Sequence, residues 1–161
     1  MSDAPAQPVQ ATFQIEKVYV KDISLEIPHS PKIFMEQVQP QLEVQINTSA
    51  DNFQEGFYEV TVSATVTAKV GERKLFLAEA VQAGIFQLRG VKPEDMGPLL
   101  GIACPAQIYP YVRETISDMI NRGGFPPVIL APINFEALYL QQQQNAAPVQ
   151  LGPRFEVARG N

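Results

Sequence analysis

The chain has 161 residues, of which 45% are hydrophobic and 18% are charged, and its formal net charge is −5. This composition predicts one globular domain with a core of its own and excludes an intrinsically disordered protein. The negative charge and the lack of any lysine- or arginine-rich run argue against a nucleic-acid partner, because phosphate groups attract basic surfaces.

The N-terminal segment, residues 1–12, is rich in alanine, proline and glutamine, and we predict a disordered arm there. It has neither the basic start nor the apolar stretch of a signal peptide, and no apolar run in the chain approaches the length of a membrane span. The single cysteine, Cys104, excludes an internal disulfide. Together these features predict a cytoplasmic protein without direct membrane insertion.

The first predicted strand covers residues 13–27 and contains two irregularities. Its apolar residues change from odd to even positions and back again, which a β-bulge or a bend at each change would explain. These residues are Phe13, Ile15, Val18, Val20, Ile23, Leu25 and Ile27. Asp22, Ser24 and Glu26 lie on the opposite side of this strand. They form either an ordinary solvated face or an acidic surface that attracts a basic partner.

The next segment, residues 28–40, is bounded by prolines and carries the apolar side chains of Ile33, Phe34 and Met35. The strands and helices predicted below form a single four-stranded sheet with one helical layer, and such an arrangement leaves these side chains uncovered. Uncovered apolar surface and free sheet edges predict oligomerisation or the binding of a partner.

Two further strands follow from alternation of apolar and polar residues. Residues 38–46 form the second, and Pro40 indicates an edge position or a strand start. Residues 47–56 are predicted to be a polar connection. Residues 58–70 alternate without a break, which predicts a third strand with one buried and one solvated face.

A glycine-containing turn at residues 71–73 is predicted to lead into a fourth strand, residues 74–88. Leu77 and Glu79 share one face of that strand. If Glu79 is solvated, Leu77 is an exposed leucine beside an acid, which is a plausible docking position. If Leu77 is buried, Glu79 needs a partner.

The C-terminal part predicts two helices. The first runs from about residue 106 to residue 122 with one apolar face, and Gly123-Gly124 ends it. Asn134 is a good N-cap for a second helix that starts at Phe135. Four strands joined by short turns and followed by helices predict an α+β fold, in which a four-stranded antiparallel sheet has helices packed on one face.

The sequence predicts no catalytic, cofactor or metal site. His29 and Cys104 could in principle form a base and a nucleophile, but nothing in the sequence brings them together. We expect an exposed turn histidine and a small buried thiol. One histidine and one cysteine cannot supply a zinc site, and no phosphate-binding or nucleophile-elbow motif is present.

Three blocks of sequence, taken in order, resemble the SecB family of bacterial protein-export chaperones. They are residues 13–26, residues 76–86 and the stretch CPAQIYPYVRETISDMINRGGFPPVILAPINFEALY, residues 104–139. The resemblance predicts a SecB-like domain over residues 13–144, followed by a flexible tail over residues 145–161.

The resemblance implies an ATP-independent holdase that binds unfolded precursor proteins in the cytosol and delivers them to the SecA ATPase for translocation. It implies a homotetramer, a dimer of dimers, with the helix of residues 106–122 packed between the dimers. No enzymatic activity and no cofactor are implied. Arg154 and Arg159 make this tail unlike the acidic tails of the family, so any contact of such tails with SecA is in doubt for this chain.

Two sets of site residues follow from the resemblance. Acids and a leucine on the sheet surface are expected to dock SecA, at Asp22, Glu26, Leu77 and Glu79. An extended apolar groove is expected to bind the client protein, with candidates Ile33, Phe34, Met35, Phe135, Leu138 and Tyr139. For each groove candidate, ordinary core packing is the competing interpretation.

Two other functions remain open from the residues themselves. One is a small-ligand-binding or enzymatic α+β domain with a pocket between the sheet and the helices, which would need convergent polar groups there. The other is a structural subunit with one fixed partner and no client binding.

Overall fold

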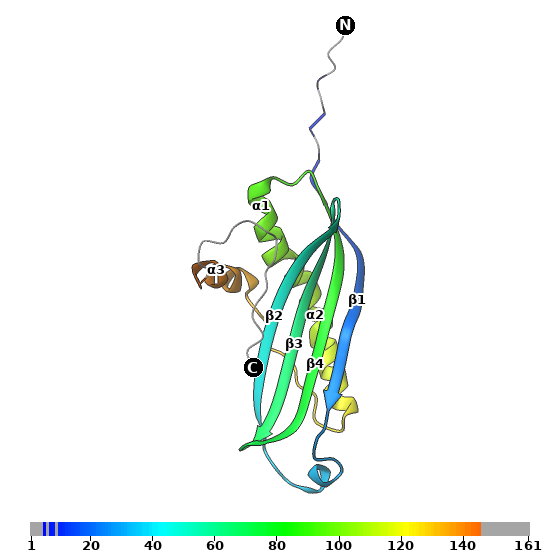
Figure 1. Cartoon of the computed structure of the whole chain (residues 1–161), viewed down its shortest axis with the longest axis vertical. Coiled ribbons are helices and arrows are strands. Elements are labelled where there is room, and N and C mark those ends of the chain that lie inside the picture. Colours follow the sequence, from blue (N-terminus) through cyan, green and yellow to red (C-terminus); the bar gives the residue numbers. More distant parts are fainter. Residues whose placement is uncertain (1–4, 6, 9, 146–161) are drawn as a thin grey trace.

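A computed structural model describes residues 5, 7, 8 and 10–145 (Figure 1). The predicted tail beyond Asn145 and half of the predicted N-terminal arm, residues 1–4, 6 and 9, lie outside the described residues. The elements in chain order are β1 (Thr12–Glu26), a short 3-10 turn (Lys32–Met35), β2 (Gln41–Gln54), β3 (Phe57–Val70), β4 (Arg73–Arg89), α1 (Pro93–Pro98), a π-helical turn (Leu99–Ala103), α2 (Cys104–Arg122) and α3 (Phe135–Asn145). None of the described helices is long and apolar enough to cross a membrane.

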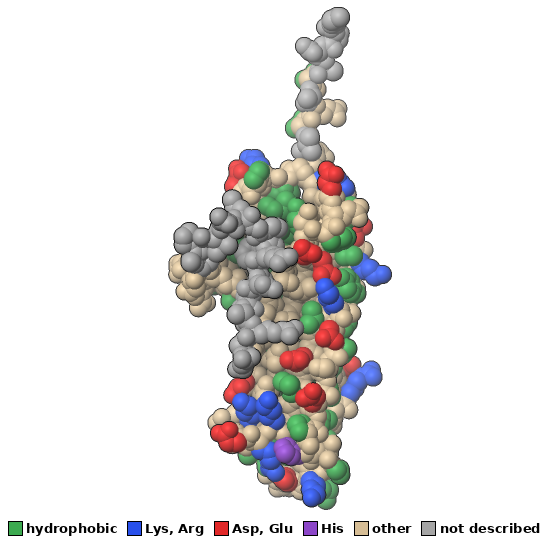
Figure 2. Space-filling model, viewed as in Figure 1, with side chains coloured by type: hydrophobic (Ala, Val, Ile, Leu, Met, Phe, Trp, Pro, Cys, Tyr) green, Lys and Arg blue, Asp and Glu red, His purple; other side chains and the backbone are tan. Residues whose placement is uncertain are grey.

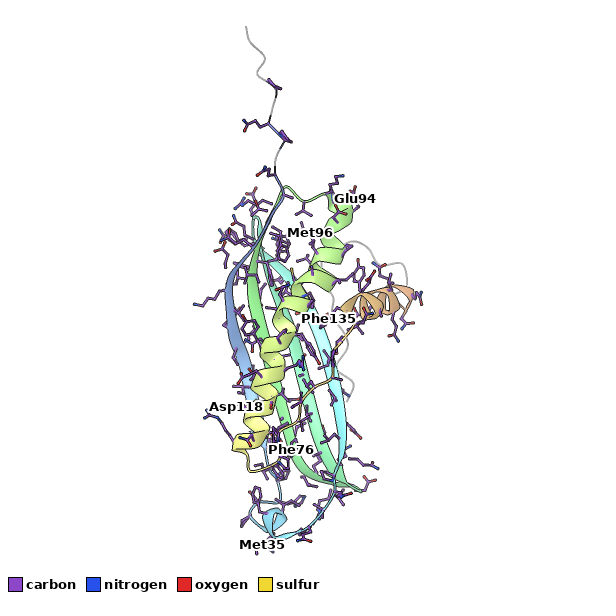
Figure 3. The ribbon with its side chains drawn as sticks, turned by 180° about the vertical axis from the view of Figure 1, so that it is seen from behind. Met35, Phe76, Glu94, Met96, Asp118 and Phe135 are labelled. Atoms are coloured by element: carbon purple, nitrogen blue, oxygen red, sulfur yellow. The ribbon has the colours of Figure 1, made fainter. Side chains whose placement is uncertain are left out.

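The four strands form one antiparallel sheet in the order β1-β4-β3-β2, so β1 and β2 are its edges. Helix α2 lies along the sheet and packs on β4 and β3, as Figures 1 and 3 show from the two sides. We call the sheet face under α2 the inner face and the opposite one the outer face. The predicted α+β architecture is confirmed.

Local patterns explain the strands. The register of β1 against β4 shifts between Ile15 and Lys17 and again between Val20 and Asp22, so both predicted irregularities are present and are β-bulges. The inner face of β3 is fully buried along its length, at Val60, Val62, Ala64, Val66 and Ala68. The turn between β3 and β4 has Gly71 at a φ of 59°, a conformation that glycine adopts without strain.

The predicted polar connection over residues 47–56 is wrong, because β2 continues to Gln54 and pairs with β3 throughout. Thr48 and Ala50 carry on the inner-face alternation and are buried. Threonine and alanine are too small and too polar to make that alternation visible as an apolar pattern. The polar residues between them belong to the outer face.

The helical region starts earlier than predicted, since α1 and the π-helical turn lead directly into α2 at Cys104. Proline lacks a backbone donor, and Pro98 and Pro110 lie inside these helices, so the hydrogen-bond ladder is irregular there. The predicted second helix is confirmed: Asn134 Oδ1 accepts a hydrogen bond from the Ala137 N–H at 3.0 Å, as an N-cap does.

Close approaches position the helices on the sheet. A Cβ atom on Gly84 of β4 would lie 2.4 Å from Ile108 Cδ1, so α2 can sit this close only over a glycine. A Cβ atom on Gly101 would likewise lie 2.5 Å from the ring of Tyr139, which seats α3 against the π-helical turn. Tyr109 of α2 contacts Phe135 edge-on, with ring centroids 5.5 Å apart.

Candidate functional site

The outer face of the sheet carries a shallow polar trough of about 430 Å³. Figure 2 shows this face, with acidic and basic side chains spread among neutral polar ones over its lower half. The trough crosses all four strands. Its lining residues are Asp22, Glu43, Gln45, Asn47, Ser63, Ala64, Thr65, Thr67, Lys69, Lys74, Glu79, Ala80 and Val81. Because alternate residues of each strand face outward, the trough is built from the polar half of each alternation.

The strand register brings the four predicted docking residues onto this face. Glu26 lies directly opposite Leu77, Glu79 lies opposite Ser24, and Asp22 lies opposite Val81. Glu79 and both acids of β1 are exposed, whereas Leu77 is half-buried. Of the two alternatives for the fourth strand, the structure therefore has a solvated Glu79 beside a partly exposed leucine.

Several outer-face residues in the trough were missed from the sequence, among them Glu43, Thr65, Lys69 and Lys74. The polar half of the alternation in β2 and β3 was a signal that they share a face. Only the register, which pairs Thr67 with Leu77 and with Glu43, makes them neighbours of the predicted docking residues.

A separate charged cluster lies farther along the outer face. Glu59 of β3 accepts hydrogen bonds from the Tyr19 hydroxyl and, at 2.6 Å, from Lys21 Nζ. Partial burial acts to raise the pKa of Glu59, but these two hydrogen bonds outweigh it and the pKa is lowered. Burial, followed by the hydrogen bond to the Glu59 carboxylate, raises the pKa of Tyr19 to about 12. The cluster ties the bulged part of β1 to β3 across β4.

The groove candidates fall into two separate groups. Ile33, Phe34 and Met35 lie in the 3-10 turn at one end of the molecule, and Figure 3 shows Met35 far from Phe135 near α3. Ile33 is buried in the core, while Met35 is 88% exposed. Phe34 is half-exposed and stacks on Phe125, with ring centroids 5.3 Å apart.

In the other group, Phe135 and Tyr139 are buried and Leu138 is half-buried. The two groups do not form one continuous set of exposed side chains in this chain. The sequence could not separate them, because an apolar residue beside a helix or turn has the same appearance whether it points into the core or into solvent.

Apolar side chains that the fold leaves uncovered lie on the inner face of both edge strands. On β2, Leu42 and Val44 are each 47% exposed, since α2 packs over the two central strands. On β1, the exposed residues of this face are Phe13, Ile15, Val20 and Ile23, with Ile23 at 50%. These two surfaces, which we call the β2 margin and the β1 margin, were missed as binding candidates. The alternating pattern had assigned their residues to a buried face.

The structure offers no support for a nucleophile–base pair. Cys104 is fully buried at the start of α2, and burial raises the pKa of its thiol to about 12. His29 is exposed in the turn before Lys32. Among the described residues, no three histidine, cysteine or carboxylate side chains are grouped so that they could hold a metal ion. The described trough lies on the sheet face opposite the helices, not between the sheet and the helices.

Comparisons with known proteins agree with one another. The family model described as preprotein translocase subunit SecB matches residues 6–146. A protein-export protein SecB from Chromobacterium violaceum is 55% identical over 141 residues, which cover 88% of this chain and 94% of that protein. One from Methylobacillus flagellatus is 54% identical over 144 residues, covering 89% and 92%. One from Neisseria meningitidis serogroup B is 50% identical over 143 residues, covering 88% and 97%.

A solved structure has the same fold. It is a SecB-like chaperone of Mycobacterium tuberculosis in complex with a peptide from an antitoxin, and it superposes with a TM-score of 0.62. The match covers 75% of this chain and 90% of that one, at 17% sequence identity. At this identity the likeness concerns the fold alone.

Proposed function

We propose a function for this chain from its family, since it belongs to the SecB family of protein-export chaperones. It holds unfolded precursor proteins in the cytoplasm without ATP and delivers them to the SecA ATPase. The structural observation that carries this proposal is the apolar surface left uncovered on the edge strands. Unfolded chains expose apolar side chains and unpaired backbone groups, and an edge strand with an apolar margin can bind both. A chaperone that binds only the unfolded state slows folding by mass action.

For the client site, we propose the β2 margin together with the neighbouring exposed residues of the 3-10 turn, Phe34 and Met35. Phe34 is held by Phe125, which in turn contacts Phe76 of β4 at 4.8 Å between ring centroids. Of the other groove candidates, Ile33 supports the site from within the core, whereas Phe135, Leu138 and Tyr139 lie apart from it at α3. This assignment favours a client that runs alongside β2, where backbone groups of the edge strand remain available.

A refolding assay tests client binding. A denatured precursor protein is diluted into buffer with and without the chaperone, in the absence of ATP, and its refolding rate is followed. We expect near-complete arrest at near-stoichiometric chaperone and relief when SecA is added. Unchanged refolding would falsify the holdase function.

The site itself is tested by the double substitution Leu42→Asp and Val44→Asp. Both side chains are about half exposed, so the fold should survive, and arrest of refolding should weaken about tenfold in concentration because carboxylates replace the apolar contact. Phe53→Asp is the matched control, because Phe53 is similarly exposed at the other end of the same strand. Equal arrest by the double variant and the control would contradict the site.

For SecA, we propose that Asp22, Glu26, Leu77 and Glu79 form the docking surface, as the resemblance implies. Their common position on the outer face, away from the β2 margin, supports simultaneous binding of a client and SecA. We expect Glu79→Lys to weaken SecA binding more than tenfold, since it replaces an attraction with a repulsion. It should leave refolding arrest unchanged. Glu94→Lys, at an exposed position in α1, has the same charge change and should bind SecA normally.

We also propose that the functional unit is a homotetramer, a dimer of dimers. The β1 margin supports self-association, because its four apolar residues lie on an edge strand and their burial against another copy would stabilise the assembly. The solvent side of α2 is mostly polar and carries one exposed aromatic residue, Tyr111. A helix contact between dimers would therefore be centred on Tyr111.

A further inference from the structure

The polar trough has unlike charges at its two ends. Glu79 and Asp22 lie at one end, and Lys69 and Lys74 lie at the other. The register fixes this order: Lys69 lies opposite Lys74, and Thr65, four residues earlier on β3, lies opposite Glu79. Four residues of antiparallel strand span roughly 13 Å. An extended peptide on this face has the same repeat, so about four of its residues separate the two ends.

The lysine end is not explained by the needs of the fold. Like charges directly opposite each other in a sheet are destabilising, and Lys69 and Lys74 are such a pair. Lys69 has an ion pair with Glu43 at 3.4 Å, with 33% of its side chain exposed. Within the described part of the chain, Lys74 forms no ion pair or side-chain hydrogen bond and is exposed. Its ammonium group is free to bind an acidic group from outside.

The acidic end is equally available. Glu79 is exposed and has no ion pair among the described residues, and Asp22 Oδ1 accepts only the backbone N–H of Ile23, at 2.9 Å. Between the two ends the lining consists of Thr67 and Glu43, which lie opposite each other, and hydroxyl and amide side chains such as Gln45 and Ser63 flank the acidic end. Such a floor suits a polar, extended segment and offers little to an apolar one.

We propose that the trough binds an extended segment of a partner protein that carries a basic residue over Glu79 and Asp22 and a carboxylate, about four residues away, over Lys69 and Lys74. This inference rests on the proposed docking function of the outer face and adds its specificity. The lysine end determines the orientation, because a reversed segment would place like charges together at both ends.

Three synthetic peptides of equal length test the inference on the full chain by fluorescence anisotropy at low salt. The bipolar peptide has two lysines and then two glutamates, separated by two neutral polar residues, so that each lysine lies four residues from a glutamate. The basic peptide has glutamines in place of the glutamates, and the mixed peptide has the bipolar composition with lysine and glutamate alternating. We expect the bipolar peptide to bind about three- to fivefold more tightly than either of the others, which is the effect of one or two exposed ion pairs.

Lys74→Glu should remove the advantage of the bipolar peptide over the basic peptide while leaving binding of the basic peptide intact or tighter. Lys92→Glu is the matched control, because Lys92 is exposed, lies outside the trough and gives the same change in net charge. In this control, and in the unaltered protein, the advantage should persist at low salt and disappear at high salt.

Two outcomes distinguish the inference from the function on which it rests. If Lys74→Glu keeps the full advantage, or if no advantage exists, the lysine end has no role in recognition and the inference is wrong. Docking by the acidic end would then still stand, provided that Glu79→Lys weakens binding of the basic peptide and of SecA. If Glu79→Lys weakens neither, the docking function itself is wrong.

Discussion

Acidic side chains on the outer face differ in whether their carboxylates are available to bind a partner. The Glu59 carboxylate accepts hydrogen bonds from Tyr19 and Lys21, and its pKa is lowered, so its charge is already paired within the molecule. Glu79, in contrast, has no ion-pair partner among the described residues. Both are outward-facing acids on central strands, and only their surroundings separate the structural role of Glu59 from the docking role proposed for Glu79.

The Tyr19 hydroxyl makes the free energy of unfolding depend on pH in the alkaline range. Its pKa is raised from 10.0 to about 12 in the folded state. The unfolded chain therefore loses this proton first. The contribution of Tyr19 to stability is complete below about pH 10 and is lost as the pH rises toward 12.

We expect Tyr19→Phe to be less stable than the unaltered protein at neutral pH, because a hydrogen bond to a carboxylate is lost. The gap in free energy of unfolding should close between about pH 10 and 12. Urea unfolding at several pH values measures this. The raised pKa of Cys104 acts in the same range but is common to both proteins, so it cancels in the difference. A gap that stays constant would contradict the assignment.

The Cys104 thiol is expected to be unreactive in the folded protein. Its pKa of about 12 keeps it protonated at neutral pH, and the thiolate is the nucleophile. Alkylation by iodoacetamide should be on the order of a thousandfold slower than that of a free thiol, and normal in concentrated guanidinium. Rapid alkylation of the native protein would show an accessible thiolate and revive a catalytic interpretation.

At the scale of elements, one close contact determines how deeply α2 sits on the sheet. Ile108 of α2 lies directly over Gly84 of β4, a residue that is opposite Val60 on one side and Val18 on the other. Helix α2 can therefore approach β4 without a side chain between them. The same placement leaves the β1 and β2 margins beyond the reach of the helix, which links a core glycine to the uncovered apolar surfaces.

We expect Gly84→Ala to destabilise the protein by about 1–3 kcal/mol, because the new methyl group overlaps Ile108 Cδ1 in a packed core. Ile108→Val removes that atom and should recover part of the loss when combined with Gly84→Ala. A double-mutant cycle of urea unfolding measures the coupling between the two positions. Additive effects of the two substitutions would contradict a direct contact.

At the scale of the whole molecule, the two faces of the sheet divide the proposed tasks. The inner face has apolar margins, where we propose that clients and other copies of the chain bind, whereas the outer face is polar and charged. The net charge of −5 per chain adds up on association, which favours solubility and attraction to basic clients. A monomer would expose both margins to solvent.

Light scattering at micromolar concentration should give a mass four times the 17.8 kDa of one chain. We expect Ile23→Asp to lower the mass, because it places a carboxylate in the β1 margin. Tyr111→Asp should yield dimers if α2 joins the dimers. A monomeric mass for the unaltered protein would contradict the tetramer, and full tetramers of both variants would contradict these two contacts.

The sequence by itself determined much of the local structure. Alternation identified the strands of β1, β3 and β4, phase changes identified both bulges, and Asn134 identified the start of α3. These signals are local, because side-chain periodicity and capping depend on neighbours in the chain.

Only the tertiary structure decided the rest. The register placed Glu79 in one trough with Asp22 and with Lys74, and coverage by α2 decided that Val44 is exposed although it belongs to the inner face. It also separated Met35 from Phe135, which the sequence had put into one groove. Register and coverage depend on residues that are distant in the chain, so no local pattern contains them.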